Sequence, residues 1–255
     1  MYPPPPLKLG FSLVELSIVL VILGLLTGGI LAGQSLIRAA ELRAVSTEFS
    51  RFYTASQTFR DKYFAIPGDM TNATAFWGKS TACGGASAAG TCDGNGDGLV
   101  PTNFAGVAGA TDEGLQFWRQ LILAGLIEGT YSGLLNASGT FTYGTETPRS
   151  KLTNGGYYIS HAVNFPGDAS AYALDYGNFI ELSGPSGPPL KPEEAWNIDT
   201  KLDDGKPASG KLIARYWNNA CAAADDGSSA NNDLVASYRL TDSTKQCNLT
   251  YRKLF

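Results

Sequence analysis

The chain has 255 residues, a formal net charge of −4 and 16% charged residues, against about 25% in an average soluble protein. Its length is enough for one large domain with its own core, and its acidic balance argues against a nucleic-acid-binding surface. The single histidine, His161, excludes a zinc site built on paired histidines.

The first element in the chain is an uncharged apolar run over residues 16–37. As a helix, this run would extend roughly 33 Å at about 1.5 Å per residue, which is enough to cross the hydrocarbon layer of a bilayer. A cleaved secretory signal has a shorter apolar stretch of about 7–15 residues, followed by a small-residue cleavage site. The run is therefore predicted to be a transmembrane helix, and an ordinary signal anchor is one interpretation of it.

One acidic residue, Glu15, lies among the apolar residues at the start of this run. An ionised carboxylate at membrane depth costs several kcal/mol unless it is paired. An ordinary anchor gives no reason for such a residue, so the sequence predicts a function for Glu15.

The string Gly10-Phe11-Ser12-Leu13-Val14-Glu15 and the apolar run after it resemble the class III signal of type IV prepilins and type II secretion pseudopilins. The resemblance covers only this segment. It implies that a prepilin peptidase cleaves after Gly10 on the cytoplasmic side, that Phe11 becomes the N-methylated first residue, and that the helix remains as the anchor. The mature chain would then have 255 − 10 = 245 residues.

The same resemblance implies a location and partners. We expect a single-pass protein of the bacterial inner membrane with its C-terminal domain in the periplasm, which then assembles into a pilus or pseudopilus. Its partners would be copies of itself, other pilins or pseudopilins, and the prepilin peptidase.

The charge of Glu15 can be explained in two ways. After cleavage, Phe11 would carry a positive amine in an apolar setting, and Glu15 of a neighbouring subunit could neutralise it, so that assembly relieves both charges. Alternatively, Phe11 and Glu15 pair within one chain, because residues four apart face each other on a helix. We favour the intersubunit pair.

Four glycines, Gly24, Gly28, Gly29 and Gly33, form two overlapping small-x-x-x-small pairs in the apolar run. In lipid, such pairs let helix backbones approach closely, which would suit packing in a filament core. The alternative is that glycine is simply frequent in membrane helices.

The helix is predicted to continue over residues 38–66 as an amphipathic helix. Apolar or small residues recur there at spacings of three and four, and the charged residues, Glu48 among them, lie largely off this stripe; the stripe is Leu42, Val45, Phe49, Phe52, Ser56, Phe59 and Tyr63. Pro67 and Gly68 are expected to end the helix. The predicted organisation is therefore a leader (1–10), a transmembrane assembly helix (11–37), its amphipathic continuation (38–66) and a globular domain (67–255).

The globular part is predicted to be α+β, with the long helix packed on an antiparallel sheet and large loop insertions. Residues 69–110 have the composition of a loop region. Thr111-Asp112 could cap a helix that continues to about Leu123, and Pro192 could begin a short helix to Asp199. Runs rich in β-branched and aromatic residues predict strands at 157–163, 172–182, 211–217, 234–240 and 247–254.

A candidate calcium loop lies at residues 93–98. Asp93, Asn95 and Asp97 alternate with glycines, as in the first half of an EF-hand loop. Phe104 stands where the closing glutamate would be, so Asp112 or Glu113 would have to complete the site. Some type II secretion pseudopilins hold such a loop with calcium. The alternative is a metal-free turn cluster, which is also our interpretation of Asp199, Asp203 and Asp204.

The four cysteines fall into two local pairs, Cys83 with Cys92 and Cys221 with Cys247. Local pairing is the simplest of three possible connectivities, and it implies an oxidising compartment. Such bonds would stabilise a loop-rich domain by about 2–4 kcal/mol. Free thiols are the alternative.

Taken together, these features favour a structural filament subunit rather than an enzyme, with no small-molecule substrate. A minor pilin displayed for adhesion or DNA uptake is a second hypothesis. A membrane-anchored periplasmic protein of another function is a third.

Overall fold

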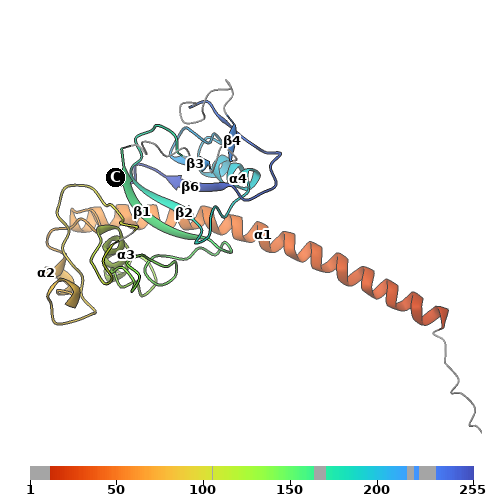
Figure 1. Ribbon diagram of the computed structural model, residues 1–255, viewed down its shortest axis with the longest axis horizontal. Coiled ribbons are helices and arrows are strands. Elements are labelled where there is room, and N and C mark those ends of the chain that lie inside the picture. Colours follow the sequence, from red (N-terminus) through yellow and green to blue (C-terminus); the bar gives the residue numbers. More distant parts are fainter. Residues whose placement is uncertain (1–11, 105, 164–170, 217–220, 224–233) are drawn as a thin grey trace, which may run out of the picture. The chain divides into compact units, whose positions relative to one another are not determined.

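The computed structural model describes residues 12–104, 106–163, 171–216, 221–223 and 234–255. The chain divides at Ala40 and Glu41 into an N-terminal unit and a larger C-terminal unit. One long helix, α1 (Leu13–Tyr63), is continuous across this boundary (Figure 1). The architecture is α+β, as predicted, with this helix and an antiparallel sheet.

The N-terminal part of α1 is apolar and uncovered. Its large apolar side chains from Leu13 to Ile37 are at least half exposed, which is unfavourable in water. Among the described residues, α1 is the helix that is long and apolar enough to cross a membrane. This agrees with single-pass anchoring.

The C-terminal part of α1 lies in the core of the larger unit. The predicted stripe is confirmed, since Val45, Phe49, Phe52 and Phe59 are almost completely buried. The ring of Phe52 meets the rings of Trp118 and Tyr157 edge-on at centroid distances of 5.0 Å. Edge-to-face pairs of this kind add to the free energy gained from burial.

The sheet that packs on this stripe has four antiparallel strands in the order β1-β2-β6-β3. Side chains alternate between its two faces. Tyr157 and Phe49 are in ring contact, so Tyr157 and its cross-strand partner Leu182 face α1. The next pair, Tyr158 and Glu181, therefore lies on the opposite face. The strands are β1 (Gly156–Ala162), β2 (Gly177–Ser183), β3 (Leu212–Tyr216) and β6 (Cys247–Tyr251).

The remaining elements are short. Helix α3 (Glu113–Leu123) begins, as predicted, at Asp112, whose side chain accepts a hydrogen bond from the N–H of Leu115. The others are α2 (Ala73–Trp77), the 3₁₀ helix η1 (Thr81–Cys83), α4 (Pro192–Leu202), β4 (Ala222–Ala223) and β5 (Ser237–Tyr238).

Several predicted boundaries were wrong. Helix α1 ends at Tyr63, before Pro67, because Phe64 adopts a left-handed conformation with φ of +53° that terminates a helix. The segment 172–176 precedes β2 and is not part of a strand. The predicted strand at 234–240 is only the two-residue β5, which pairs with β4 outside the main sheet.

The placement of Glu48 was also wrong, because this charged residue is buried against the sheet with 8% of its surface exposed. Its carboxylate accepts hydrogen bonds from the hydroxyls of Ser150 at 2.6 Å and Tyr157 at 2.8 Å, and from the N–H of Lys151 at 3.0 Å. These three donors replace water around the buried charge. Glu48 therefore fixes α1 to the start of β1.

We predict that Glu48→Ala destabilises the folded protein by about 2–4 kcal/mol, because it leaves three donors without their shared acceptor in the core. The matched control is Glu41→Ala on the same helix, whose partly exposed carboxylate accepts from Thr153. Its cost should stay below about 1 kcal/mol. Chemical denaturation measures both, and equal effects would contradict an anchoring role for Glu48.

Candidate functional site

The predicted cleavage residues Gly10 and Phe11 lie outside the described residues, and the description begins at Ser12. The first turn of α1 contains a reciprocal pair. The backbone N–H of Ser12 donates to Glu15 Oε2 at 2.8 Å, and the N–H of Glu15 donates to Ser12 Oγ at 3.2 Å. This is a capping box, in which the side chains satisfy two N–H groups that a helix start leaves unpaired.

The capping box assigns Glu15 a contact that the sequence analysis did not predict. The signal was present, because Ser12-x-x-Glu15 has the spacing of a capping box and precedes a helix. A carboxylate in the first turn also interacts favourably with the helix dipole. Glu15 thus stabilises the start of its own helix, and its side chain is exposed.

The four glycines of the apolar run line open space in the single chain. Gly24, Gly28 and Gly29 are exposed, and Gly33 is half-buried. Apart from the helix's own nearby backbone, a methyl group added at any of them would meet none of the described atoms within 4 Å. The fold of the chain therefore gives no reason for small residues here, and packing against another helix stays a prediction.

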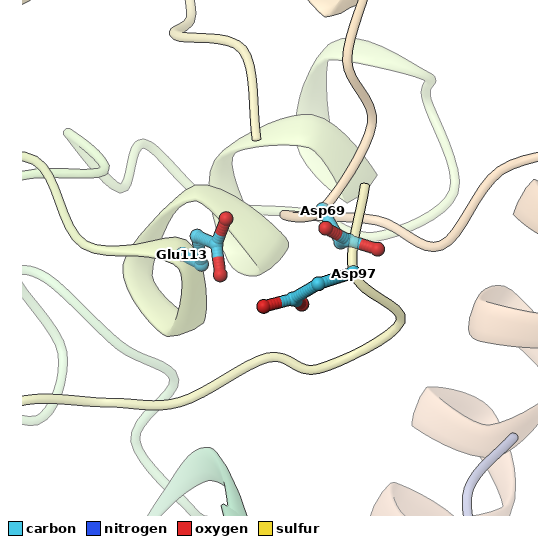
Figure 2. Close-up of side chains that lie close together, drawn as sticks. All are labelled: Asp69, Asp97 and Glu113. Atoms are coloured by element: carbon cyan, nitrogen blue, oxygen red, sulfur yellow. The ribbon is translucent and has the colours of Figure 1, made fainter. Parts of the chain in front are cut away.

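A cluster of three carboxylates lies in the larger unit, formed by Asp69, Asp97 and Glu113 (Figure 2). Asp69 follows the end of α1, Asp97 lies in the predicted calcium loop, and Glu113 is the first residue of α3. Figure 2 shows the three side chains around a common space. One oxygen of each lies within 4.8 Å of the others.

Two glycines allow the backbone to approach closely at this cluster. Gly68 has a φ of +88°, and a Cβ there would lie 2.3 Å from the carbonyl oxygen of Glu113. A Cβ at Gly94 would lie 2.4 Å from the backbone of Asp69. These contacts place Asp69 between the loop at residues 93–98 and α3, where its carboxylate accepts from the N–H groups of Gly96 at 2.6 Å and Gly98 at 2.9 Å.

The electrostatics of the cluster favour a cation. Partial burial raises the pKa of Glu113, the N–H of Asn95 lowers it, and the charges of Asp69 and Asp97 raise it further. Three crowded carboxylates are the kind of oxygen ligand that Ca²⁺ takes in proteins. The residues therefore fit a calcium ion, and calcium binding stays a prediction.

The ligand set differs in part from the one proposed from sequence. Asp97 and Glu113 lie in the cluster, whereas Asp93 accepts from the N–H and the hydroxyl of Thr74 at 2.7 and 2.8 Å and so holds the start of α2. Asn95 donates its side-chain amide to Asp97 Oδ2 at 3.0 Å. Asp69 was not predicted, because nothing in the sequence indicates that the end of α1 folds back onto this loop.

The second acidic group, Asp199, Asp203 and Asp204, also comes together. Burial raises the pKa of Asp199 to about 7, while a hydrogen bond from the hydroxyl of Tyr238 at 2.7 Å favours the charged form. Asp203 accepts from the N–H of Leu212 at 2.9 Å. These contacts join α4 to β5 and β3, which agrees with a structural turn.

Two disulfides, Cys83–Cys92 and Cys221–Cys247, confirm the local pairings. The first closes the loop that precedes Asp93. The second joins the residue before β4 to the first residue of β6, and so connects the two sheets. Both stabilise a domain in which long stretches are loop.

Comparisons of the chain with models of protein families, with curated proteins and with solved structures give no match.

We predict that calcium raises the melting temperature of the protein and that chelation reverses the rise. A gain of about 1 kcal/mol corresponds to roughly 2–4 °C for a domain of this size. Glu113→Gln should abolish the calcium response, because it removes one charged ligand while its amide oxygen still accepts from Asn95.

Asp93→Asn is the matched control, because Asp93 lies beside Thr74 rather than in the cluster. It should retain the calcium response. The melting temperatures of the wild type, Glu113→Gln and Asp93→Asn are measured with calcium and with chelator. If Asp93→Asn removed the calcium response and Glu113→Gln retained it, the ligand set derived from the carboxylate cluster would be contradicted. If calcium left the melting temperature of the wild-type protein unchanged, the loop would be a metal-free turn cluster.

Proposed function

We propose that the chain is a type IV pilin-like or pseudopilin-like filament subunit, made as a prepilin and polymerised through its N-terminal helix. In this proposal the prepilin peptidase cleaves after Gly10, Phe11 becomes the methylated first residue, and the larger unit lies in the periplasm before assembly. The protein has a structural role and catalyses no reaction.

The observation that carries the proposal is that the two parts of α1 differ in composition and burial. This 51-residue helix joins an apolar part with uncovered side chains to a part whose stripe is buried in a folded domain. A membrane would cover the apolar part before assembly, and neighbouring helices would cover it in a filament. The prepilin-like string at residues 10–15 leads directly into the uncharged run at residues 16–37.

The capping box adds a contact of Glu15 that exists before assembly. Ser12 satisfies part of the Glu15 carboxylate before assembly, which lowers the cost of keeping this charge near apolar surroundings. In the filament, Glu15 would neutralise the amine of Phe11 of a neighbouring subunit. The glycines at positions 24, 28, 29 and 33 would let the helices pack closely there.

The hypothesis of a minor pilin for adhesion or DNA uptake differs in what the larger unit does. It requires a ligand site on that unit, whereas a major subunit requires only surfaces for its neighbours. The net charge of −4 gives no support to DNA binding. An ordinary membrane anchor differs in that residues 1–10 would stay attached.

Substitutions at Glu15 separate its charge from its capping role. Glutamine can replace glutamate in a capping box, so Glu15→Gln keeps the helix cap and removes the charge, while Glu15→Ala removes both. We predict that both variants are cleaved normally and that both lose most of their filament assembly. Immunoblotting of sheared filaments and of membranes measures assembly and cleavage separately.

Ser12→Ala is the control, because it weakens the helix start by about 0.5–2 kcal/mol and keeps the charge. It should still assemble. Normal filaments from Glu15→Gln together with none from Glu15→Ala would show that Glu15 acts only as a cap, and would contradict intersubunit charge pairing.

A further inference from the structure

The end of α1 carries an exposed aromatic side chain that the fold of the single chain does not explain. Phe64 is 93% exposed, the largest fraction among the described large apolar side chains. Its backbone is left-handed, with a φ of +53°, a conformation that glycine adopts freely and phenylalanine rarely. A glycine here would end the helix without exposing an aromatic ring. The phenylalanine therefore indicates a contact outside the chain.

The surface around Phe64 also offers a negative charge. The cations on either side of Asp61 lie over aromatic rings of their own chain, Arg60 over Phe255 and Lys62 over Tyr63. Asp61 is exposed and, within the residues that the structure describes, forms no ion pair. An exposed ring and an available carboxylate thus lie within one turn of each other at the end of α1.

A hollow of about 210 Å³ lies at the opposite end of the larger unit. Its wall includes Asn154 and Gly155, which directly follow Thr153. The N–H of Thr153 donates to Glu41, the first residue of the larger unit. From Glu41 to the last residue of α1 the helix rises roughly 33 Å. The hollow and Phe64 are therefore separated by the length of the helix within this unit.

This hollow suits a phenyl ring in size and in chemistry. A cavity of about 150 Å³ is enough to hold benzene. Phe141, Tyr143 and Pro185 give the wall apolar surface, on which a further aromatic ring can pack. Arg149 also lines the hollow and is exposed, and among the described residues it forms no ion pair. Its guanidinium can contact the face of a ring and can pair with a carboxylate.

We infer that Phe64 of one copy of the chain inserts into this hollow of a second copy, and that Asp61 of the first copy pairs with Arg149 of the second. The two charges are opposite, and neither is paired within its own chain. Because the contact joins different surfaces of the two copies, each bound pair keeps a free Phe64 at one end and a free hollow at the other. The contact therefore extends into an open chain rather than closing as a dimer.

Other occupants explain less of what is observed. A small molecule in the hollow would leave the exposure of Phe64 unexplained, and a contact of Phe64 with an unrelated protein would leave the hollow unexplained. A second copy accounts for both with one contact, and a filament supplies this partner to every subunit. The inference rests on the proposed filament function and adds to it the contact through which successive larger units meet.

The test is crosslinking of the full-length protein in cells that assemble it. Asp61→Cys marks the surface around Phe64, and Thr142→Cys marks the wall of the hollow. Both positions are exposed, and the native cysteines are held in disulfides. Sheared filaments are treated with a short bismaleimide and separated by denaturing electrophoresis. The chain with both substitutions should give a ladder of dimers, trimers and higher multimers.

Each single-cysteine variant should stay monomeric, because every contact needs one cysteine of each kind. The reagent is too short to join the two positions within one chain, since they lie at opposite ends of the larger unit. The ladder therefore reports contact between copies.

A second measurement removes the ring itself. Phe64→Ala should reduce the yield of sheared filaments about fivefold or more, because every contact loses its central aromatic side chain. Its melting temperature should not fall, since the lost side chain is exposed. Leu240→Ala is the control, because Leu240 is also an exposed apolar residue of the larger unit but lines neither surface. It should assemble as the wild type does.

The inference is overturned if the double-cysteine chain forms filaments without a ladder, or if Phe64→Ala and Leu240→Ala assemble alike. Dimers from Asp61→Cys alone would also overturn it, because the same surface would then meet itself. If the double-cysteine chain does not assemble, the comparison of Phe64→Ala with Leu240→Ala decides.

These outcomes leave the filament proposal intact, because cleavage and filaments are still observed in the wild type. An uncleaved wild-type chain that forms no filaments would overturn the filament proposal, and this inference with it.

Discussion

The burial of the second part of α1 against the sheet is the interaction on which the rest of the structure depends. Phe49 and Phe52 pack on Tyr157 of the sheet, and Phe52 also packs on Trp118 of α3. Glu48 fixes the rotation of the helix by its three hydrogen bonds to the region of β1. The same helix also contains residues 13–37, whose large apolar side chains are at least half exposed.

The same packing explains why the two faces of the sheet differ. The face toward α1 carries Tyr157, Ile180 and Leu249, which belong to the core, and the hydroxyl of Tyr157 donates to Glu48 of α1. The opposite face carries the ion pair of Glu181 and Arg215 beside a hollow.

Much of the fold could be predicted because it depends on local signals. Spacings of three and four placed the buried stripe of α1, and Asp112 marked the start of α3. The features that were not predicted depend mostly on contacts between residues far apart in the sequence. Glu48 is buried because Ser150 and Tyr157 supply donors from far along the chain. Asp69 joins the carboxylate cluster because Gly68 lets the segment after α1 approach the backbone of α3. Phe64 ends the helix in a conformation that its sequence does not signal. Gly10 and Phe11 lie outside the described residues, so their role is argued from the motif.

The central claim is that the apolar helix becomes the N-terminus of a processed filament subunit. The most direct measurement is the intact mass and N-terminal sequence of the protein recovered from membranes of a host with an active prepilin peptidase. The account predicts a chain of 245 residues that begins at a methylated Phe11, since 255 − 10 = 245. A chain that still begins at Met1 would contradict it, and would make α1 an ordinary anchor for a periplasmic domain.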